Sequence, residues 1–255
     1  MFPRTGRGNN FNPRSQGGGT NYDALKSKAI VPEVPYPNWD VESMNYLIHS
    51  SSIPRPNVGK AHQVAKEMKR LRLPILGVRE TRWTEARKVH LTTGETVLHS
   101  GLAGDDAPQE KGVALILSKE AGKSLKECEP ISEQIIFAKF QSECQKTTIF
   151  QVYAPMNNAQ EGVKEDFYQQ FQCTCSKRKA RDLTMVIGDL NAKVGADNRN
   201  WEVSTGTRSD GVINENGEMF SDFCESNGLV EHSSHTLFPH KKSHKLTWRS
   251  PDGIN

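Results

Sequence analysis

The spacing of apolar and polar positions along the chain predicts three helices. Apolar residues recur at helical spacing between Asn57 and Pro74, with Lys and Arg among the intervening positions, and this predicts a helix that Asn57 caps and Pro74 ends. A second helix is predicted over 163–175, where an apolar residue or a cysteine recurs at every fourth position and basic residues follow. A third is predicted over 218–226, ahead of an Asn-Gly pair that is typical of a helix end.

Short runs rich in branched and aromatic residues predict strands between these helices. The predicted strands cover 75–78, 94–98, 112–118, 134–140, 147–153, 183–188 and 246–249. Strands and helices mix throughout the chain, and no internal repeat is visible. The pattern therefore predicts an α/β or α+β protein with a substantial sheet.

The N-terminal part of the chain carries neither pattern. Residues 1–22 are rich in Gly, Asn and Arg, and we expect a disordered leader that is either plainly solvated or in contact with nucleic-acid phosphates. Residues 23–57 hold several prolines and no clean period, so they are expected to be poorly ordered and are not assigned to a fold. The folded domain is expected to occupy 58–255.

Composition narrows the function classes. The chain has 255 residues and a formal net charge of +3, which resides in Arg4, Arg7 and Arg14, so the remainder is formally neutral and is not a globally basic nucleic-acid-binding protein. A polyanionic partner would have to be bound by local basic patches or through a metal ion. No run approaches the ~20 apolar residues of a membrane span, so no membrane partner is expected. The five cysteines, an odd number at irregular spacing, favour a reducing, intracellular compartment.

Candidate chemistry lies just beyond the ends of predicted buried strands. Glu80 follows one strand, Tyr153 closes another, and Asp189 and Asn191 follow a third. Strand ends are where a rigid sheet can hold a carboxylate against a ligand. A Glu and an Asp from different strands are typical hard-oxygen ligands of Mg²⁺, and a Tyr hydroxyl can donate to a phosphate oxygen.

Each of these residues also has a purely structural interpretation. Glu80 could be a surface residue, Tyr153 a packed edge residue, and the run that holds Asp189 and Asn191 a turn with an Asx cap. None of the signals is strong alone, whereas the ordered set is much stronger.

The ordered set resembles a known family. The chain is similar to the endonuclease domain of RTE-type (LINE-like) non-LTR retrotransposons, within the endonuclease/exonuclease/phosphatase superfamily that includes apurinic endonucleases and DNase I. The resemblance covers about residues 58–255. It is carried by these runs, in this order: GVRETRW, KGVALILSKEA, QVYAP, GDLNAKVG, NENGEMFSDFCESN and LFPHKKSHKLTWRSPDG.

The resemblance implies a fold and an activity. The fold would be a four-layer α/β sandwich, with two packed mixed β-sheets flanked by helices. The activity would be hydrolysis of a DNA phosphodiester that depends on Mg²⁺, with Mn²⁺ as a substitute, and the nick would prime reverse transcription. The expected partner is DNA, with no small-molecule cofactor, and the expected state is a nuclear monomer.

The resemblance also assigns roles to single residues. Glu80 matches the metal-binding Glu of the family's Ser-Glu-x-x-Trp run, which reads RETRW here. Tyr153 matches the tyrosine that stabilises the scissile phosphate. Asp189 matches the acid that positions or deprotonates the attacking water, and Asn191 matches its phosphate-contacting partner. Trp248 matches an aromatic residue near the base pocket.

Two departures from the family pattern affect these roles. The family carries a Trp-Asn-Val-Arg run near its first strand, and the nearest counterpart of its metal- or phosphate-holding Asn is Asn45, in a poorly matching context. The family's later Asp-His pair has no counterpart before Asn255, so the domain is expected to be C-terminally truncated and its catalysis impaired. A non-catalytic descendant that binds DNA or a protein is the alternative, and a superfamily phosphatase is a weaker third possibility.

A basic, His-rich stretch precedes the end of the chain. Lys245 and Arg249 flank Trp248 there, an interleaving that suits a DNA-facing loop, although a plain solvated loop fits equally. A zinc site is not favoured, because the nearest pair of cysteines, at 173 and 175, has the wrong spacing.

Overall fold

The computed structural model describes residues 58–101, 111–143, 145–206 and 211–232. Several sequence predictions lie outside these residues: the leader 1–22, the segment 23–57, the Asn57 cap, the strand at 246–249, and the candidate site residues Asn45, Lys245, Trp248 and Arg249.

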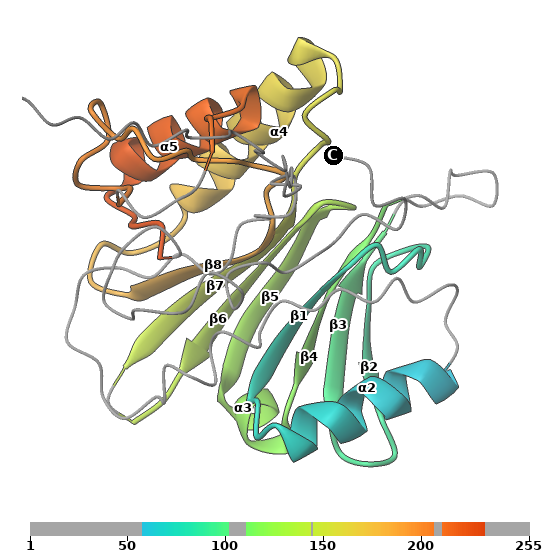
Figure 1. Ribbon diagram of the computed structural model, residues 1–255. Coiled ribbons are helices and arrows are strands. Elements are labelled where there is room, and N and C mark those ends of the chain that lie inside the picture. The colour runs from blue at the N-terminus through green and yellow to red at the C-terminus, as the bar shows by residue number, and fades with distance from the viewer. Residues whose placement is uncertain (1–57, 102–110, 144, 207–210, 233–255) are drawn as a thin grey trace, which may run out of the picture.

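Two four-stranded sheets form the centre of the molecule (Figure 1). The first has the order β1-β4-β3-β2 and is antiparallel throughout. Its strands are β1 (Ile75–Arg79), β2 (Arg87–His90), β3 (Thr96–Ser100) and β4 (Val113–Leu117).

The second sheet has the order β5-β6-β7-β8 and is mixed, because β7 and β8 are parallel. Its strands are β5 (Leu125–Ser132), β6 (Ile135–Gln141), β7 (Lys146–Tyr153) and β8 (Leu183–Asp189). A parallel pair needs a long crossover, which here runs through the helix α4 (Glu161–Cys175).

Helices cover the outer faces of both sheets. The helix α2 (Val58–Arg70) lies on the first sheet, and α4 and α5 (Glu215–Asn227) lie together on the second (Figure 1). A short helix, α3 (Lys119–Ser124), joins the two sheets. The resulting order of layers is helix, sheet, sheet, helix, which confirms the predicted four-layer α/β sandwich; of the two sheets, only the second is mixed.

The alternation of side chains along β4 separates two of the core layers. Ala114 and Ile116 pack with the apolar face of α2, whereas Val113, Leu115 and Leu117 pack between the two sheets. All five are fully buried, so β4 is a central strand of the whole molecule.

Aromatic rings fill the third core layer, between the second sheet and its helices. Phe150 of β7 packs edge-on against Phe171 of α4, and Phe171 stacks on Phe223 of α5 with ring centroids 4.2 Å apart. This layer fixes α4 and α5 over β7 and β8, the two strands that reach the candidate site.

The predicted elements are largely present, with three omissions. The pattern along the sequence did not predict β2, β5 or α3, and α5 begins three residues earlier than predicted. Every residue of β2 is exposed, so the strand has no apolar alternation to detect. β5 is an edge strand with Pro130 and two register shifts, features that weaken a strand signal. In the described part of the chain, no helix has the length and apolar character that a membrane crossing needs.

Candidate active site

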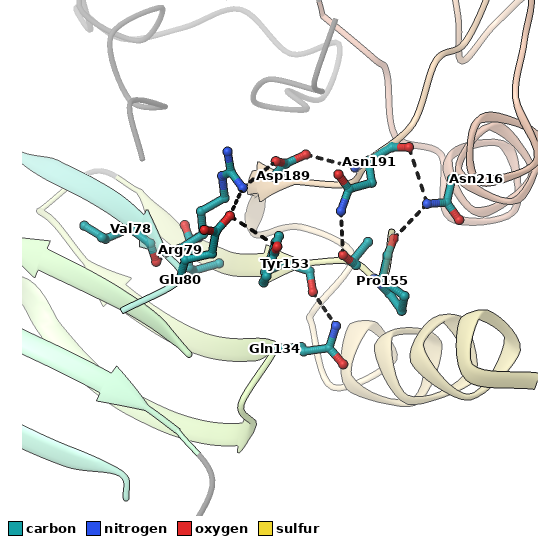
Figure 2. A network of polar contacts seen from close by, with 11 residues as sticks. Val78, Arg79, Glu80, Gln134, Tyr153, Pro155, Asp189, Asn191 and Asn216 are labelled. Atoms are coloured by element: carbon teal, nitrogen blue, oxygen red, sulfur yellow. Dashed lines mark hydrogen bonds and ion pairs between the residues drawn. The ribbon is translucent and has the colours of Figure 1, made fainter. Parts of the chain in front are cut away.

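Four candidate residues meet at one edge of the sandwich (Figure 2). Glu80 directly follows β1, Tyr153 ends β7, Asp189 ends β8, and Asn191 follows two residues later. Because β7 and β8 are parallel, their carboxyl ends reach the same edge, where Tyr153 and Asp189 are paired in register. β1 packs across both strands, which brings the end of the first sheet to the same place.

The backbone bends sharply where the site residues leave their strands. Glu80 and Asn191 adopt the left-handed region, with φ of 53° and 49°. Asn tolerates this region, but Glu does so at a cost, and such strain gathers at functional sites. Gly188, directly before Asp189, has φ of 139°, and a Cβ there would lie 1.9 Å from the Val152 carbonyl oxygen. Only glycine permits this close approach of β8 to β7.

Tyr153 links the second sheet to Glu80. Its hydroxyl donates a hydrogen bond to Glu80 Oε1 at 3.2 Å. Burial, and to a smaller extent the nearby charge of Glu80, raise the pKa of Tyr153 to about 12. The phenol is therefore protonated at neutral pH, and its single hydrogen is donated to Glu80.

Arg79 is the residue that sequence reasoning missed. Its Nη1 contacts Glu80 Oε1 and lies 3.1 Å from Asp189 Oδ2. Its guanidinium carbon lies 5.5 Å from the centroid of the Tyr153 ring, over the ring face. Asp189 is fully buried, so the ion pair with Arg79 crosses the interface between the sheets in a nearly dry environment. Arg79 thus contacts three of the four predicted residues.

Asn191 holds the segment after β8. Its backbone N–H donates to Asp189 Oδ1 at 2.9 Å, and its side-chain Nδ2 donates to the Ala154 carbonyl oxygen at 2.8 Å. The first bond orients the Asp189 carboxylate and the second ties the ends of β7 and β8 together. The side-chain amide nitrogen is therefore engaged with the protein backbone.

The start of α5 supports the same segment from behind. Asn214 caps the helix, and its Oδ1 accepts hydrogen bonds from the backbone N–H groups of Gly217 and Lys193, both at 2.8 Å. The fully buried Asn216 donates from Nδ2 to the Pro155 carbonyl oxygen at 2.8 Å and to that of Asn191 at 3.3 Å. These two residues lie in the run NENGEMFSDFCESN, so the signal was present in the sequence without a role attached to it.

Gln134 fixes the backbone of Tyr153. The Nε2 of Gln134 donates to the Tyr153 carbonyl oxygen at 2.7 Å, and the Tyr153 N–H donates to the Gln134 carbonyl oxygen at 2.9 Å. The candidate residues are thus held by a second set of hydrogen bonds from the residue before β6, the residues that follow β7 and the start of α5 (Figure 2).

The residues as arranged do not fit a divalent metal. Mg²⁺ requires several hard oxygen ligands free to approach it, whereas the carboxylates of Glu80 and Asp189 are both paired with the Arg79 guanidinium. Across the described ranges, no group of three or more His, Cys, Asp or Glu side chains gathers as a metal site. A cation at this edge would therefore require Arg79 to move away.

Sequence comparison finds relatives that are longer than this chain. Craniofacial development protein 2 of Bos taurus is 33% identical over 231 residues, a match that covers 91% of this chain and 36% of the relative. Craniofacial development protein 2 of Tragulus javanicus is also 33% identical over 231 residues, with 37% of its length covered. The chain thus spans little more than a third of these relatives, and no family model matches it.

Comparison with solved structures finds similar folds at low identity. The endonuclease domain of TRAS1, a telomere-specific non-LTR retrotransposon, gives a TM-score of 0.45 at 16% identity over 70% of each chain. AP endonuclease LMAP from Leishmania major gives a TM-score of 0.48 at 11% identity, over 80% of this chain and 76% of that one. By sequence, the chain is similar to craniofacial development protein 2 over 91% of its own length.

Proposed function

We propose that this chain carries the DNA phosphodiester-cleaving site of a retrotransposon-type endonuclease, acting in the nucleus as a monomer. The observation that supports this most is the convergence of Glu80, Tyr153 and Asp189 from three strands at one sheet edge. These residues are far apart in sequence, and each matches a functional position of the family that the chain resembles. Mg²⁺ or Mn²⁺ is the expected cofactor on that resemblance, and its use requires Arg79 to release the two carboxylates.

The chemistry of the individual groups suits a phosphodiester. The protonated Tyr153 hydroxyl would donate to a non-bridging phosphate oxygen once it leaves Glu80. Asp189 is oriented by the Asn191 N–H, as a residue that positions a water molecule must be. Its other oxygen is paired with Arg79, so the resting site is not ready for this task, and slow cleavage is expected.

A supercoiled-plasmid nicking assay in Mg²⁺ tests the proposal. The parent chain is compared with Glu80→Gln and Asp189→Asn, which keep the size of each side chain and remove its charge. Asp197→Asn is the matched control, because Asp197 is exposed and pairs with Arg199. We expect weak nicking by the parent and the control, and at least a tenfold loss in the two site variants whose fold circular dichroism shows to be intact. Equal nicking by the parent and Asp189→Asn would contradict the proposal.

The second candidate is a non-catalytic domain that binds DNA. The contacts of Arg79 favour it, because they occupy both candidate metal-binding carboxylates. Fluorescence anisotropy with a labelled DNA duplex in EDTA, taken together with the nicking assay in Mg²⁺, distinguishes the two candidates. DNA binding without nicking by a folded parent chain would support the non-catalytic domain. The affinity of the chain for DNA should fall steeply with salt, because phosphate contacts would dominate the binding.

A further inference from the structure

We infer that Arg79 is a built-in cation of the candidate site, which occupies the position of a divalent metal between Glu80 and Asp189 and excludes a metal while it is there. The inference deepens the proposed function and rests on it for the identity of the site. It concerns which cation the two carboxylates hold, and this can be measured without any cleavage assay.

The geometry places one nitrogen atom between the two sheets. Arg79 Nη1 contacts Glu80 Oε1 at the end of β1 and Asp189 Oδ2 at the end of β8. A single positive group thus bridges two carboxylates that belong to different sheets, which is the arrangement that a bridging metal ion would otherwise provide (Figure 2).

The backbone explains how neighbouring residues can reach the same point. Consecutive side chains in a strand point to opposite faces, so Arg79 and Glu80 would ordinarily diverge. Glu80 instead has φ of 53°, which turns its side chain back toward the Arg79 guanidinium. The left-handed backbone of Glu80 therefore allows the ion pair between Arg79 and Glu80 to form. The sequence alone does not show this conformation.

Arg79 and a metal ion cannot both pair with these carboxylates, because both are positively charged. Asp189 is fully buried, and a buried carboxylate needs a compensating positive group. With Arg79 in place, the set of Arg79, Glu80, Asp189 and the neutral Tyr153 carries a net charge of about −1. Adding a divalent cation beside the guanidinium would place two positive groups against the same oxygens. Removing the guanidinium leaves two carboxylates facing one another, which is an attractive site for Mg²⁺ or Mn²⁺.

Mn²⁺ binding to the full chain, followed by electron paramagnetic resonance of the free ion, tests the inference. Two substitutions form the matched pair: Arg79→Ser removes the charge and most of the volume, whereas Arg79→Lys keeps the charge. Arg199→Ser is the surface control, because Arg199 is exposed and paired with Asp197. We expect Arg79→Ser to bind about one additional Mn²⁺ per chain at least tenfold more tightly than the parent. Arg79→Lys and Arg199→Ser should match the parent.

Dependence on Glu80 assigns the bound ion to this site. Adding Glu80→Gln to Arg79→Ser should remove the gained Mn²⁺. Thermal melting gives a second measure: Arg79→Ser should melt below the parent in EDTA, and Mn²⁺ should raise its melting temperature while leaving that of the parent unchanged.

Three results would overturn the inference. The first is Mn²⁺ binding by the parent that is as tight as that expected of Arg79→Ser and that Glu80→Gln abolishes, a measurement of the parent that does not depend on whether any Arg79 variant folds. The second is a folded Arg79→Ser chain that binds no more Mn²⁺ than the parent. The third is equal gain by Arg79→Lys, because charge would then not be the cause. Metal gain by Arg79→Ser without plasmid nicking would support the inference and count against the proposed endonuclease.

Discussion

Tyr153 at the end of the second sheet donates a hydrogen bond to Glu80 at the end of the first, across 3.2 Å and 73 positions of sequence. The bond requires the phenol to remain protonated, because an ionised tyrosine would face the Glu80 carboxylate with a like charge. The protonation state of one hydroxyl is thus tied to the contact between the two sheets.

The ionisation of Tyr153 should therefore occur at unusually high pH. Burial first, and then the charge of Glu80, raise its pKa from the ordinary 10.0 to about 12. Because the folded-state pKa is raised, the protonated phenol stabilises the fold fully below about pH 10, and this contribution is lost as the pH rises through about 12. The difference in absorbance at 295 nm between the parent and Tyr153→Phe should appear near pH 12.

Glu80→Gln is the control for that titration. It removes the contribution of Glu80, which is smaller than that of burial, so the Tyr153 step should move to lower pH without reaching the ordinary value, since burial remains. A Tyr153-dependent step near pH 10 in the folded parent would contradict the assigned environment.

Asn216 should contribute to stability through the candidate site. Replacing it with alanine leaves the carbonyl oxygens of Pro155 and Asn191 without its amide donor. Because Asn216 is fully buried, we expect Asn216→Ala to lower the free energy of unfolding by about 1–3 kcal/mol in urea titrations. The exposed Asn200 provides the matched control, whose replacement by alanine should change stability by less than about 0.5 kcal/mol. Equal effects of the two substitutions would show that the contacts of Asn216 are not needed.

Gly77 allows the two sheets to approach closely behind the site. A Cβ at this position would lie 1.9 Å from Gln151 Oε1 of β7. Gly77→Ala should therefore destabilise the fold by about 1–3 kcal/mol, as overpacking does, and part of the loss should be recovered in a double variant with Gln151→Ala. A Cβ at Gly162, in the first turn of α4, meets nothing within 4 Å. Gly162→Ala should thus leave stability unchanged or raise it by up to about 1 kcal/mol. Denaturation of Gly77→Ala, Gln151→Ala and the double variant measures the coupling between the two positions, which would be absent if the sheets can separate slightly at no cost.

Lys164 joins α4 to the start of α5 through a buried ammonium group. Its Nζ lies 2.5 Å from Glu215 Oε2 and donates to the Asn157 carbonyl oxygen at 3.2 Å. Removing the negative partner leaves a buried charge less well compensated, so Glu215→Gln should cost about 1–3 kcal/mol in urea titrations. In a Lys164→Met background the same change should cost much less. An unchanged cost there would place the effect of Glu215 elsewhere.

Most of the fold could be predicted from the sequence, because most strands here are buried on both faces. β4 and β8 are continuous apolar runs whose strand character needs no tertiary information. β2 could not be predicted, because its stability comes from pairing with β3 and its four side chains are all exposed. The start of α5 was predicted from its apolar face alone, so its first turn, which holds Asn216, was left out.

The candidate site was likewise only partly predictable from the sequence. The ends of strands at Glu80, Tyr153 and Asp189 were predictable from local pattern, and the resemblance supplied the reason to group them. Arg79 was not predictable, because strand alternation directs it away from Glu80. Its role depends on a left-handed Glu80 and on the packing of β1 across β8, and neither property is local to the sequence.

The site straddles the junction of the two sheets, and we therefore expect it to form late in folding. Arg79 and Glu80 come from one sheet and Tyr153 and Asp189 from the other, so neither sheet alone contains a working set of groups. Sliding one sheet past the other by one residue, about 3.3 Å, would separate both pairs together. Such long-range contacts form slowly, after the local structure on each side is in place. Any excursion that loosens the junction therefore takes the candidate site apart before it unfolds the protein.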